Sequence, residues 1–348
     1  MKILYGVQGT GNGHIARARA MAQCLKKSGL EVQFLFSGRE KSKYFSMEEF
    51  GDYQTRQGFS FVTNKGQVDY LKTALSNNPW HFWREVKQLD LSQYDLVLND
   101  FEPVSAWAAR QQNIPSISIS HQNAFRYPVP LRGASWFDKQ VIEHFAPANY
   151  HIGLHWYHFD QPILPPIVHT HREEVAEEAF ILVYLPFEST ADISELLLRF
   201  VNHRFICYHP EIIEPELIDN IEFMPLSVSS FHHHLNRCAG VIANGGFELP
   251  SEALTLGKKL LLKPLSGQFE QLSNVATLED LGLASSMEML DASIVRRWLD
   301  EPGAESVNYP DVAQAIVAWI EKGRWDDQLA LTGELWERVD FPSYVTPS

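Results

Sequence analysis

A histidine follows a glycine-rich loop near the start of the chain. The segment GTGNGH places Gly9, Gly11 and Gly13 just ahead of His14. Glycines let the backbone turn tightly and let another molecule approach it closely. A histidine at the end of such a loop is suited to act as a general base near neutral pH. The loop is thus a dinucleotide site, a phosphate cradle or a floor beneath a reactive histidine.

The first two readings fit the loop poorly. It departs from the dinucleotide pattern GxGxxG because His14 stands where the third glycine belongs, and no acidic residue ends the next strand. A Walker loop is excluded because no Gly-Lys-Ser/Thr follows. That next strand ends at Ser37-Gly38-Arg39, and Arg39 would suit a 2′-phosphate, so an NADP enzyme stays open.

A second glycine pair lies in the other half of the chain. Gly245 and Gly246 follow an apolar strand and open a helix, where backbone N–H groups and the helix dipole attract anions. This pattern predicts a diphosphate site that needs no metal. Gln268, Glu270 and Gln271 gather at another strand-to-helix junction, and such a polar cluster suits sugar hydroxyls.

Strands alternate with helical patterns in both halves, which predicts an α/β fold. We expect two tandem Rossmann-like domains that face a central cleft, with ligands at the carboxyl ends of the strands. The expected boundaries are an N-terminal domain at 1–158, a proline-rich linker at 159–172 and a C-terminal domain at 173–324. A terminal helix within 325–348 is expected to pack back on the first domain. The expected strands are 2–7, 31–36, 94–100, 114–120, 179–186, 203–210, 239–246 and 258–265, and the first helices are 15–27 and 104–111.

Composition restricts the partners. The net charge of −14 argues against nonspecific nucleic-acid binding. Residues 1–150 carry 17 Lys and Arg against 13 Asp and Glu, so this half could make a weak peripheral membrane contact. Three cysteines without a CxxC pair indicate a reducing compartment. No apolar run has the length of a signal sequence or a membrane span, and we expect a cytoplasmic protein.

The motifs together resemble the GT-B glycosyltransferases that use nucleotide sugars. The closest likeness is to MurG-type N-acetylglucosaminyltransferases and to the UDP-glucuronosyl/glucosyltransferase superfamily. GTGNGH resembles the MurG-type GGTGGH loop, with its histidine at His14. IPSISISHQNAF (114–125) resembles that family's stretch ending in His-Glu-Gln-Asn, and ANGGFELPSEA (243–253) resembles the superfamily's donor motif.

The resemblance implies a reaction and a role for each matched residue. A UDP-sugar would donate a hexose or N-acetylhexosamine to an acceptor hydroxyl, without a metal or other cofactor and with inversion at the anomeric carbon. His14 would be the base and Asp100 the carboxylate that orients it, and Glu102 is the second candidate for that carboxylate. The donor side would comprise Phe223 stacking on uracil, Asn244, Gly245 and Gly246 at the diphosphate, Glu252 on the ribose, and Gln268, Glu270 and Gln271 on the sugar. The acceptor side would comprise Gly11, Asn12, Gly13, Glu102, His121 and Asn123.

Some departures keep other functions open. Asn244 replaces a charged phosphate contact of the superfamily, and Leu249 and Pro250 replace small hydroxyl residues. A UDP-sugar 2-epimerase of the same architecture and a catalytically silent nucleotide-sugar binding protein therefore remain alternatives. Asp100-Phe101-Glu102 also mimics a metal-binding Asp-x-Asp, but we predict no metal site. The acceptor is not predicted beyond a hydroxyl compound, for which a cell-envelope glycan or lipid is one candidate.

Overall fold

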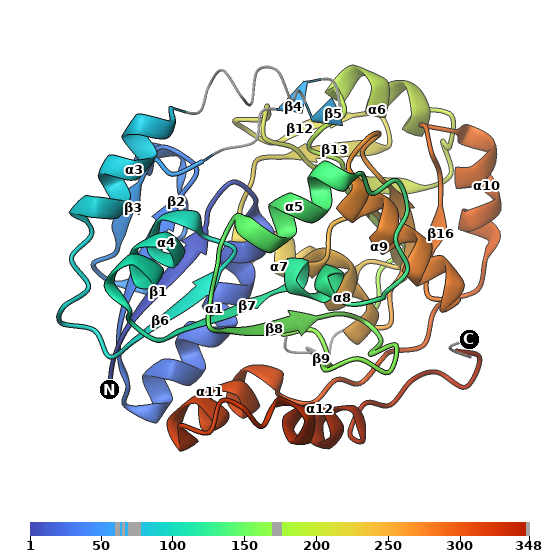
Figure 1. The fold of residues 1–348 in the computed structure, drawn as a ribbon. Helices are drawn as coiled ribbons and strands as arrows, with labels where there is room; N and C mark the ends of the chain where they lie inside the picture. Colours follow the sequence, from blue (N-terminus) through green and yellow to red (C-terminus); the bar gives the residue numbers. More distant parts are fainter. Residues whose placement is uncertain (60–62, 65–66, 69–77, 169–175, 346–348) are drawn as a thin grey trace.

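Two parallel sheets with helices on both faces form the molecule (Figure 1). The structure, a computed structural model, describes residues 1–59, 63–64, 67–68, 78–168 and 176–345. Residues 169–172 of the expected linker lie outside the described residues. The two sheets confirm the predicted pair of Rossmann-like units, because both strand orders have a central strand flanked by the crossovers of a doubly wound fold.

The first sheet belongs to the N-terminal half and has the order β3-β2-β1-β6-β7-β8-β9, with every pairing parallel. Its strands are β1 (Lys2–Gln8), β2 (Glu31–Ser37), β3 (Gln54–Arg56), β6 (Leu96–Asp100), β7 (Ser116–Ser120), β8 (Tyr150–Leu154) and β9 (Ile163–Leu164). Two short strands, β4 (Thr63–Asn64) and β5 (Gln67–Val68), form a separate antiparallel pair.

The second sheet repeats this plan with the order β12-β13-β11-β10-β14-β15-β16. Its strands are β10 (Phe180–Tyr184), β11 (Arg204–Tyr208), β12 (Glu216–Ile218), β13 (Ile221–Met224), β14 (Gly240–Asn244), β15 (Lys259–Lys263) and β16 (Ser285–Ser286). Only β12 pairs antiparallel. β1, β6, β10, β14 and β15 are almost entirely buried, as expected for strands covered on both faces.

Helices connect and cover the strands. They are α1 (Asn12–Ser28), α3 (Pro79–Gln88), α4 (Pro103–Gln112), α5 (Trp136–His144), α6 (Thr190–Leu197), α7 (Val228–Arg237), α8 (Glu248–Thr255), α9 (Phe269–Asp280), α10 (Ala292–Asp300), α11 (Val312–Lys322) and α12 (Gln328–Trp336). The 3-10 turns are η1 (Lys41–Lys43), η2 (Glu48–Phe50) and η3 (His121–Arg126). Within the described part of the chain, no helix is long and apolar enough to cross a bilayer.

The expected strands coincide with observed ones, and their ends differ by only a few residues. The expected helix 15–27 is α1, which begins earlier, at Asn12, so His14 lies in its first turn. The expected terminal helix is α12, and its Trp336 indole donates to the carbonyl of Ile163 in β9 at 2.6 Å.

The C-terminal part of the chain packs on the first unit from α11 onward, before the boundary expected at residue 324. α11 packs against α1 and α12 against β9, and Figure 1 shows both helices in red along the bottom of the molecule, with α11 next to the lower end of the blue helix α1. Residues 312–322 therefore accompany the N-terminal unit rather than the domain expected to end at 324. The reason is the apolar face of α11, where Val312, Ile316 and Ile320 are buried.

Candidate functional site

His14 and Asp100 meet where β1 and β6 end. β1 leads through the glycine loop into α1, and Asp100 is the last residue of β6. The parallel register pairs Val7 with Asp100, which sets the carboxylate beside the first turn of α1. His14 Nδ1 lies 2.8 Å from Asp100 Oδ1. The predicted histidine–carboxylate pair is thus present in this structure, although its catalytic role stays a prediction.

Asp100 and Arg17 both contact Nδ1 of His14. Burial opposes the charge of Asp100, but Arg17 and His14 outweigh it and lower the pKa of the carboxyl group. An ionised carboxylate only accepts hydrogen bonds, so Asp100 favours the tautomer with its hydrogen on His14 Nδ1, whereas Arg17 Nη2, a donor, lies 3.0 Å from the same nitrogen. No residue in the described part of the chain bonds to His14 Nε2. The tautomer that Asp100 favours has its lone pair on Nε2, which is the arrangement that a general base requires.

Arg17 holds the other side of Asp100, and we did not predict this residue. Arg17 Nε donates to Asp100 Oδ2 at 2.8 Å and Nη2 donates to Oδ1 at 2.9 Å. Burial disfavours the guanidinium charge, but Asp100 and Glu248 outweigh it and raise the pKa of Arg17. The spacing of three residues from His14 on a helix was the signal that we overlooked, because such residues share one face.

The same guanidinium joins the two halves of the molecule. Arg17 Nη1 donates to Glu248, the first residue of α8 in the second unit. Arg17 and Asp100 are fully buried and Glu248 is nearly so. Burial raises the pKa of Glu248 to about 7, although Arg17 lowers it. One guanidinium thus contacts two carboxyl groups, and Glu248 is the one that takes up a proton at the higher pH.

The glycines before His14 serve different ends. A Cβ on Gly9 would collide with the Tyr44 hydroxyl, and one on Gly13 would lie 3.0 Å from Glu248 Cγ. A Cβ on Gly11 would meet nothing within 4 Å. Packing therefore explains Gly9 and Gly13, while Gly11 lies beside open space and remains an acceptor-side candidate.

Three helices at the junction of the two units begin without a capping side chain: α1, α8 and α9. The caps of α3, α4, α5, α6, α7, α10 and α11 are all provided by side chains, and α12, away from this junction, has none. Uncapped first turns keep N–H donors available to a ligand. The side-chain oxygen of Gln268, just before α9, is also buried and has no partner in the described chain.

The loop between β14 and α8 contains Gly245 and Gly246 and follows Asn244, and the role of these three residues at a diphosphate stays a prediction. A Cβ on Gly245 would lie 2.9 Å from the carbonyl of Gln271, so this glycine is needed for packing against α9. A Cβ on Gly246 would meet nothing within 4 Å. Asn244 donates to the carbonyl of Lys263 at 2.8 Å, and its own amide oxygen is buried without a partner. Gly246 therefore has free space beside it, and the Asn244 amide oxygen has no hydrogen-bond partner in the described part of the chain.

A cavity of about 150 Å³ lies between the units beside this loop. Asn12 and Gly13 of the first unit face Glu248, Leu249 and Glu252 of α8 across it. Its other walls are Ile15, Ala16, Arg19, Phe45, Tyr184, Tyr208, Leu226, Ser227, Val228, Phe231 and His232. Glu252 therefore borders a cleft with aromatic walls, as a ribose contact would require.

Phe223 is not one of those walls, and the prediction that it stacks on a base is contradicted. Its side chain is 1% exposed in the core of the second sheet. Side chains alternate along β13, so Ile221 and Phe223 point inward while Met224 is only partly buried. The partly exposed phenylalanine and tyrosine rings that line this cavity are Phe45, Tyr184 and Phe231.

Two residues expected on the acceptor side are structural. Glu102 caps α4, accepting from the backbone N–H groups of Val104 and Ser105, and it also accepts from Ser37 Oγ at 2.6 Å. It is fully buried and cannot replace Asp100. Asn123 is buried and bonds Ser118 and the carbonyl of Ile152, which fixes η3 on β7 and β8.

His121 joins the units instead of lining an open site. Its Nε2 lies 2.7 Å from Asn274 Oδ1, its ring stacks on Phe247 at 3.9 Å, and burial lowers its pKa. The neighbouring Gln122 donates to Glu270 at 3.2 Å.

The sugar-binding candidates at α9 are only partly available to a ligand. The Gln271 side chain accepts from the backbone N–H of Leu265, so one end is occupied. Glu270 and Gln268 remain at the junction of the two units.

Glu252 provides a test of the cleft's electrostatics. Burial, reinforced by Glu248, raises its pKa to about 8. The folded protein therefore keeps a proton that the unfolded chain loses near pH 4.3, so stability is full below that pH and falls as pH rises to about 8. We expect Glu252→Gln to exceed wild type in stability at pH 8–9, by on the order of a few kcal/mol, and to match it near pH 5.

Unfolding midpoints in urea from pH 5 to 9 measure this. The matched control is Glu334→Gln, because Glu334 is exposed on α12. Parallel wild-type and Glu252→Gln curves across the range would contradict an uncharged Glu252.

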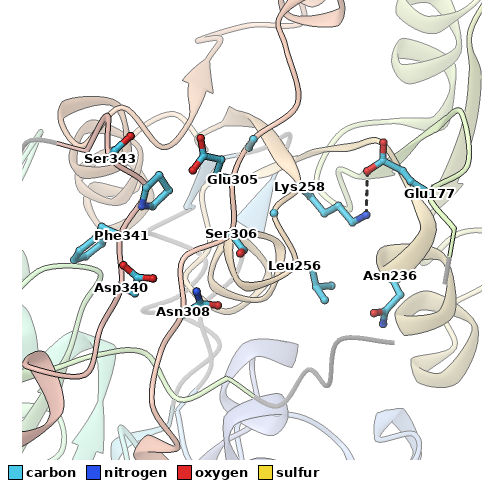
Figure 2. A pocket seen from close by; sticks show the side chains of 13 residues that line it. Glu177, Asn236, Leu256, Lys258, Glu305, Ser306, Asn308, Asp340, Phe341 and Ser343 are labelled. Carbon is cyan, nitrogen blue, oxygen red and sulfur yellow. Dashed lines mark hydrogen bonds and ion pairs between the residues drawn. The ribbon is translucent and has the colours of Figure 1, made fainter. Parts of the chain in front are cut away.

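A larger cavity, of about 640 Å³, lies elsewhere (Figure 2). Figure 2 marks an ion pair on its wall between Lys258, just before β15, and Glu177, with 3.4 Å between Nζ and Oε2. Asp340 and Phe341 lie on the opposite wall. This cavity is at the amino end of β15, whereas doubly wound sheets bind ligands at the carboxyl ends. It is therefore a poor donor site.

Sequence comparison decides the family. The model for glycosyl transferase family 1 matches residues 1–301. The chain belongs to this family, and it is a glycosyltransferase. An uncharacterized glycosyltransferase of Methanosarcina acetivorans is 24% identical over 331 residues, which is 83% of this chain and 84% of that protein. A similarly described protein of Methanosarcina mazei is 22% identical over 329 residues, covering 83% and 87%.

Solved structures share the fold of this family 1 glycosyltransferase at low identity. SnogD from Streptomyces nogalater has a TM-score of 0.57 and 16% identity, covering 97% of this chain and 99% of its own. Acinetobacter baumannii MurG has a TM-score of 0.53 and 17% identity, covering 92% and 99%. TcCGT1, solved in complex with UDP, has a TM-score of 0.58 and 12% identity, covering 96% and 94%. These likenesses confirm the GT-B fold.

Proposed function

We propose that this glycosyltransferase transfers a hexose or N-acetylhexosamine from a UDP-sugar to an acceptor hydroxyl, with inversion and without a metal. The observation that carries the proposal is the His14–Asp100 pair in the first turn of α1, where the adjacent residues Gly13 and Ile15 line one cavity with Glu248, Leu249 and Glu252 of the uncapped helix α8. One side offers a base and the other offers anion-binding donors. The UDP in the TcCGT1 structure is a further support for the donor.

The reaction needs one proton acceptor and one stabilised leaving group. His14 Nε2 takes the hydroxyl proton while the acceptor oxygen bonds to the anomeric carbon. The bond from that carbon to the diphosphate oxygen breaks at the opposite face, and UDP leaves with the electron pair. The N–H groups at Gly246 and the start of α8 hold the diphosphate charge, and each preorganised donor contributes roughly 3 kcal/mol.

Arg17 offsets the charge of the Glu248 carboxylate, which lies at the proposed diphosphate site. Glu248 is the first residue of α8, where an unpaired negative charge would repel a diphosphate. Arg17 pairs with it and also orients Asp100. The guanidinium therefore keeps the base aligned and the diphosphate site free of net repulsion.

Nucleotide screening followed by turnover tests the function. UDP at about 100 times its Kd should stabilise the protein by about 2.7 kcal/mol. Turnover of UDP-sugars, measured as released UDP with and without cell-envelope extract, should persist in excess EDTA. Stabilisation by another nucleotide but not by UDP would contradict the donor. Interconversion of UDP-sugars without UDP release would indicate an epimerase, and activity that requires added manganese would contradict metal independence.

The ribose contact gives a separate prediction. If Glu252 holds the ribose hydroxyls, Glu252→Ala leaves them without a partner and weakens UDP binding by about 1–3 kcal/mol, or roughly 5- to 150-fold in Kd. Isothermal calorimetry with UDP measures this, with Glu334→Ala as the control. Unchanged UDP affinity in the folded Glu252→Ala variant would contradict the assignment of Glu252 to the ribose.

A further inference from the structure

Arg39 lies at the carboxyl end of β2, beside the glycine loop, in a fixed position. Its Nη1 donates to Asn12 Oδ1 at 3.2 Å and its Nη2 donates to the carbonyl of Thr10 at 3.0 Å. The guanidinium also lies 5.4 Å from the centre of the Tyr44 ring. Gly38, with φ of +96°, makes the turn that brings Arg39 against this loop. The guanidinium is thus preorganised before any ligand arrives.

This guanidinium has no acidic partner among the residues that the structure describes. The adjacent Glu40 carboxylate instead pairs with Lys43 at 3.6 Å. The two other arginines of this region differ, because Arg17 pairs with two carboxylates and Arg19 lies near three glutamates. Arg39 is partly buried, and this burial lowers its pKa. Its hydrogen-bond partners in the described part of the chain are neutral, so the guanidinium is suited to bind an anion there.

Arg39 binds the loop that leads into His14. Its partners Thr10 and Asn12 precede His14 by four and two residues in the same loop. Asn12 also donates to the Tyr184 hydroxyl across the cleft, at 3.4 Å. The proposed diphosphate site lies on the other sheet, at α8. An anion bound to Arg39 would therefore sit on the side from which the acceptor approaches His14.

We propose that Arg39 binds an anionic group of the acceptor, and that the acceptor is a carboxylate- or phosphate-bearing hydroxyl compound. This inference rests on the proposed function, whose acceptor it specifies. The guanidinium has five N–H donors and two are committed to the loop, which leaves enough for a two-point contact with a carboxylate or phosphate. The bound anion would orient the neighbouring hydroxyl toward His14 Nε2.

Matched pairs of small probes test this without knowledge of the natural acceptor. Methyl glucuronide is compared with methyl glucoside, and glycerol 3-phosphate with glycerol, by ligand-observed NMR titration of the full chain with and without UDP. We expect at least one anionic probe to bind wild type 10-fold or more tightly than its neutral partner. The pair that shows the difference distinguishes a carboxylate from a phosphate.

Variants assign the effect to Arg39. Arg39→Gln should abolish the preference for the anionic probe and leave the neutral probe and UDP affinity unchanged, and Arg39→Lys should retain part of it. Arg110→Gln is the control, because Arg110 is exposed on α4 and also lies over an aromatic ring, 5.2 Å from the centre of Trp107. It should behave as wild type.

Two results would overturn the inference. One is a wild type that prefers neither anionic probe. The other is an Arg39→Gln variant that loses UDP affinity, which would place Arg39 in the donor site. Failure of wild type to bind UDP at all contradicts the proposed donor, and it is seen in the same titrations before any probe is added. The two proposals therefore fail separately.

Discussion

His14→Ala should lower turnover by about 10²–10⁴ while leaving UDP affinity nearly unchanged. The loss follows from removal of the imidazole, whose Nε2 has no partner in the described part of the chain. Asp100 cannot take over, because its two oxygens are held by His14 and Arg17. UDP affinity should persist because the proposed diphosphate donors lie on the other sheet.

Turnover at saturating donor and acceptor is the decisive measurement, with UDP affinity from calorimetry beside it. His144→Ala is the matched control, because the His144 side chain is 65% exposed on α5. A folded His14→Ala variant within a few-fold of wild type would make His14 a structural residue. A parallel loss of UDP affinity would place it in the donor site instead.

Arg17→Met should destabilise the fold by about 3–5 kcal/mol, because it leaves two buried carboxyl groups without their cation. The loss should shrink at acidic pH, where Asp100 and Glu248 take up protons. It should shrink also in the triple variant Arg17→Met, Asp100→Asn, Glu248→Gln, which removes the stranded charges. That variant should fold but remain inactive, because His14 loses its orienting carboxylate.

Urea unfolding at pH 5 and pH 8 tests this prediction. Arg110→Met is the control for loss of an exposed arginine, and it should change stability by less than about 0.5 kcal/mol. Equal losses for Arg17→Met and Arg110→Met would mean that the buried network contributes little. A loss that is the same at both pH values would contradict stranded carboxylates as its cause.

The network also changes what Asp100→Asn is expected to do. From the sequence, Asp100 was an orienting carboxylate for His14 and nothing more. The structure gives it a second task, since both of its oxygens also accept from Arg17. The substitution therefore removes a buried charge that balances Arg17, and its effect on turnover has to be read against its effect on stability.

The sequence by itself determined the architecture and the two ends of the cleft. Apolar runs of strand length alternate with helical periodicity, and this local pattern is sufficient to predict two doubly wound sheets. Carboxyl ends of parallel strands meet at one edge of a sheet, so the glycine loops before His14 and around Gly245 each lie at the ligand-binding edge of their own sheet. The strand and helix pattern and the glycine loops are properties of short segments, so they can be predicted without knowledge of the tertiary structure.

Only the tertiary structure decided which side chains share a site. Arg17 and Glu248 are 231 residues apart in sequence, and no local pattern predicts their contact. Phe223 lies on the inward face of β13 and is buried in the core, so it does not line the cleft. Glu102 caps α4, so its carboxylate already has structural partners. Whether a polar residue is a ligand contact or a structural one depends on the partners that long-range packing provides. Those partners are set by sheet register and by the docking of one unit on the other.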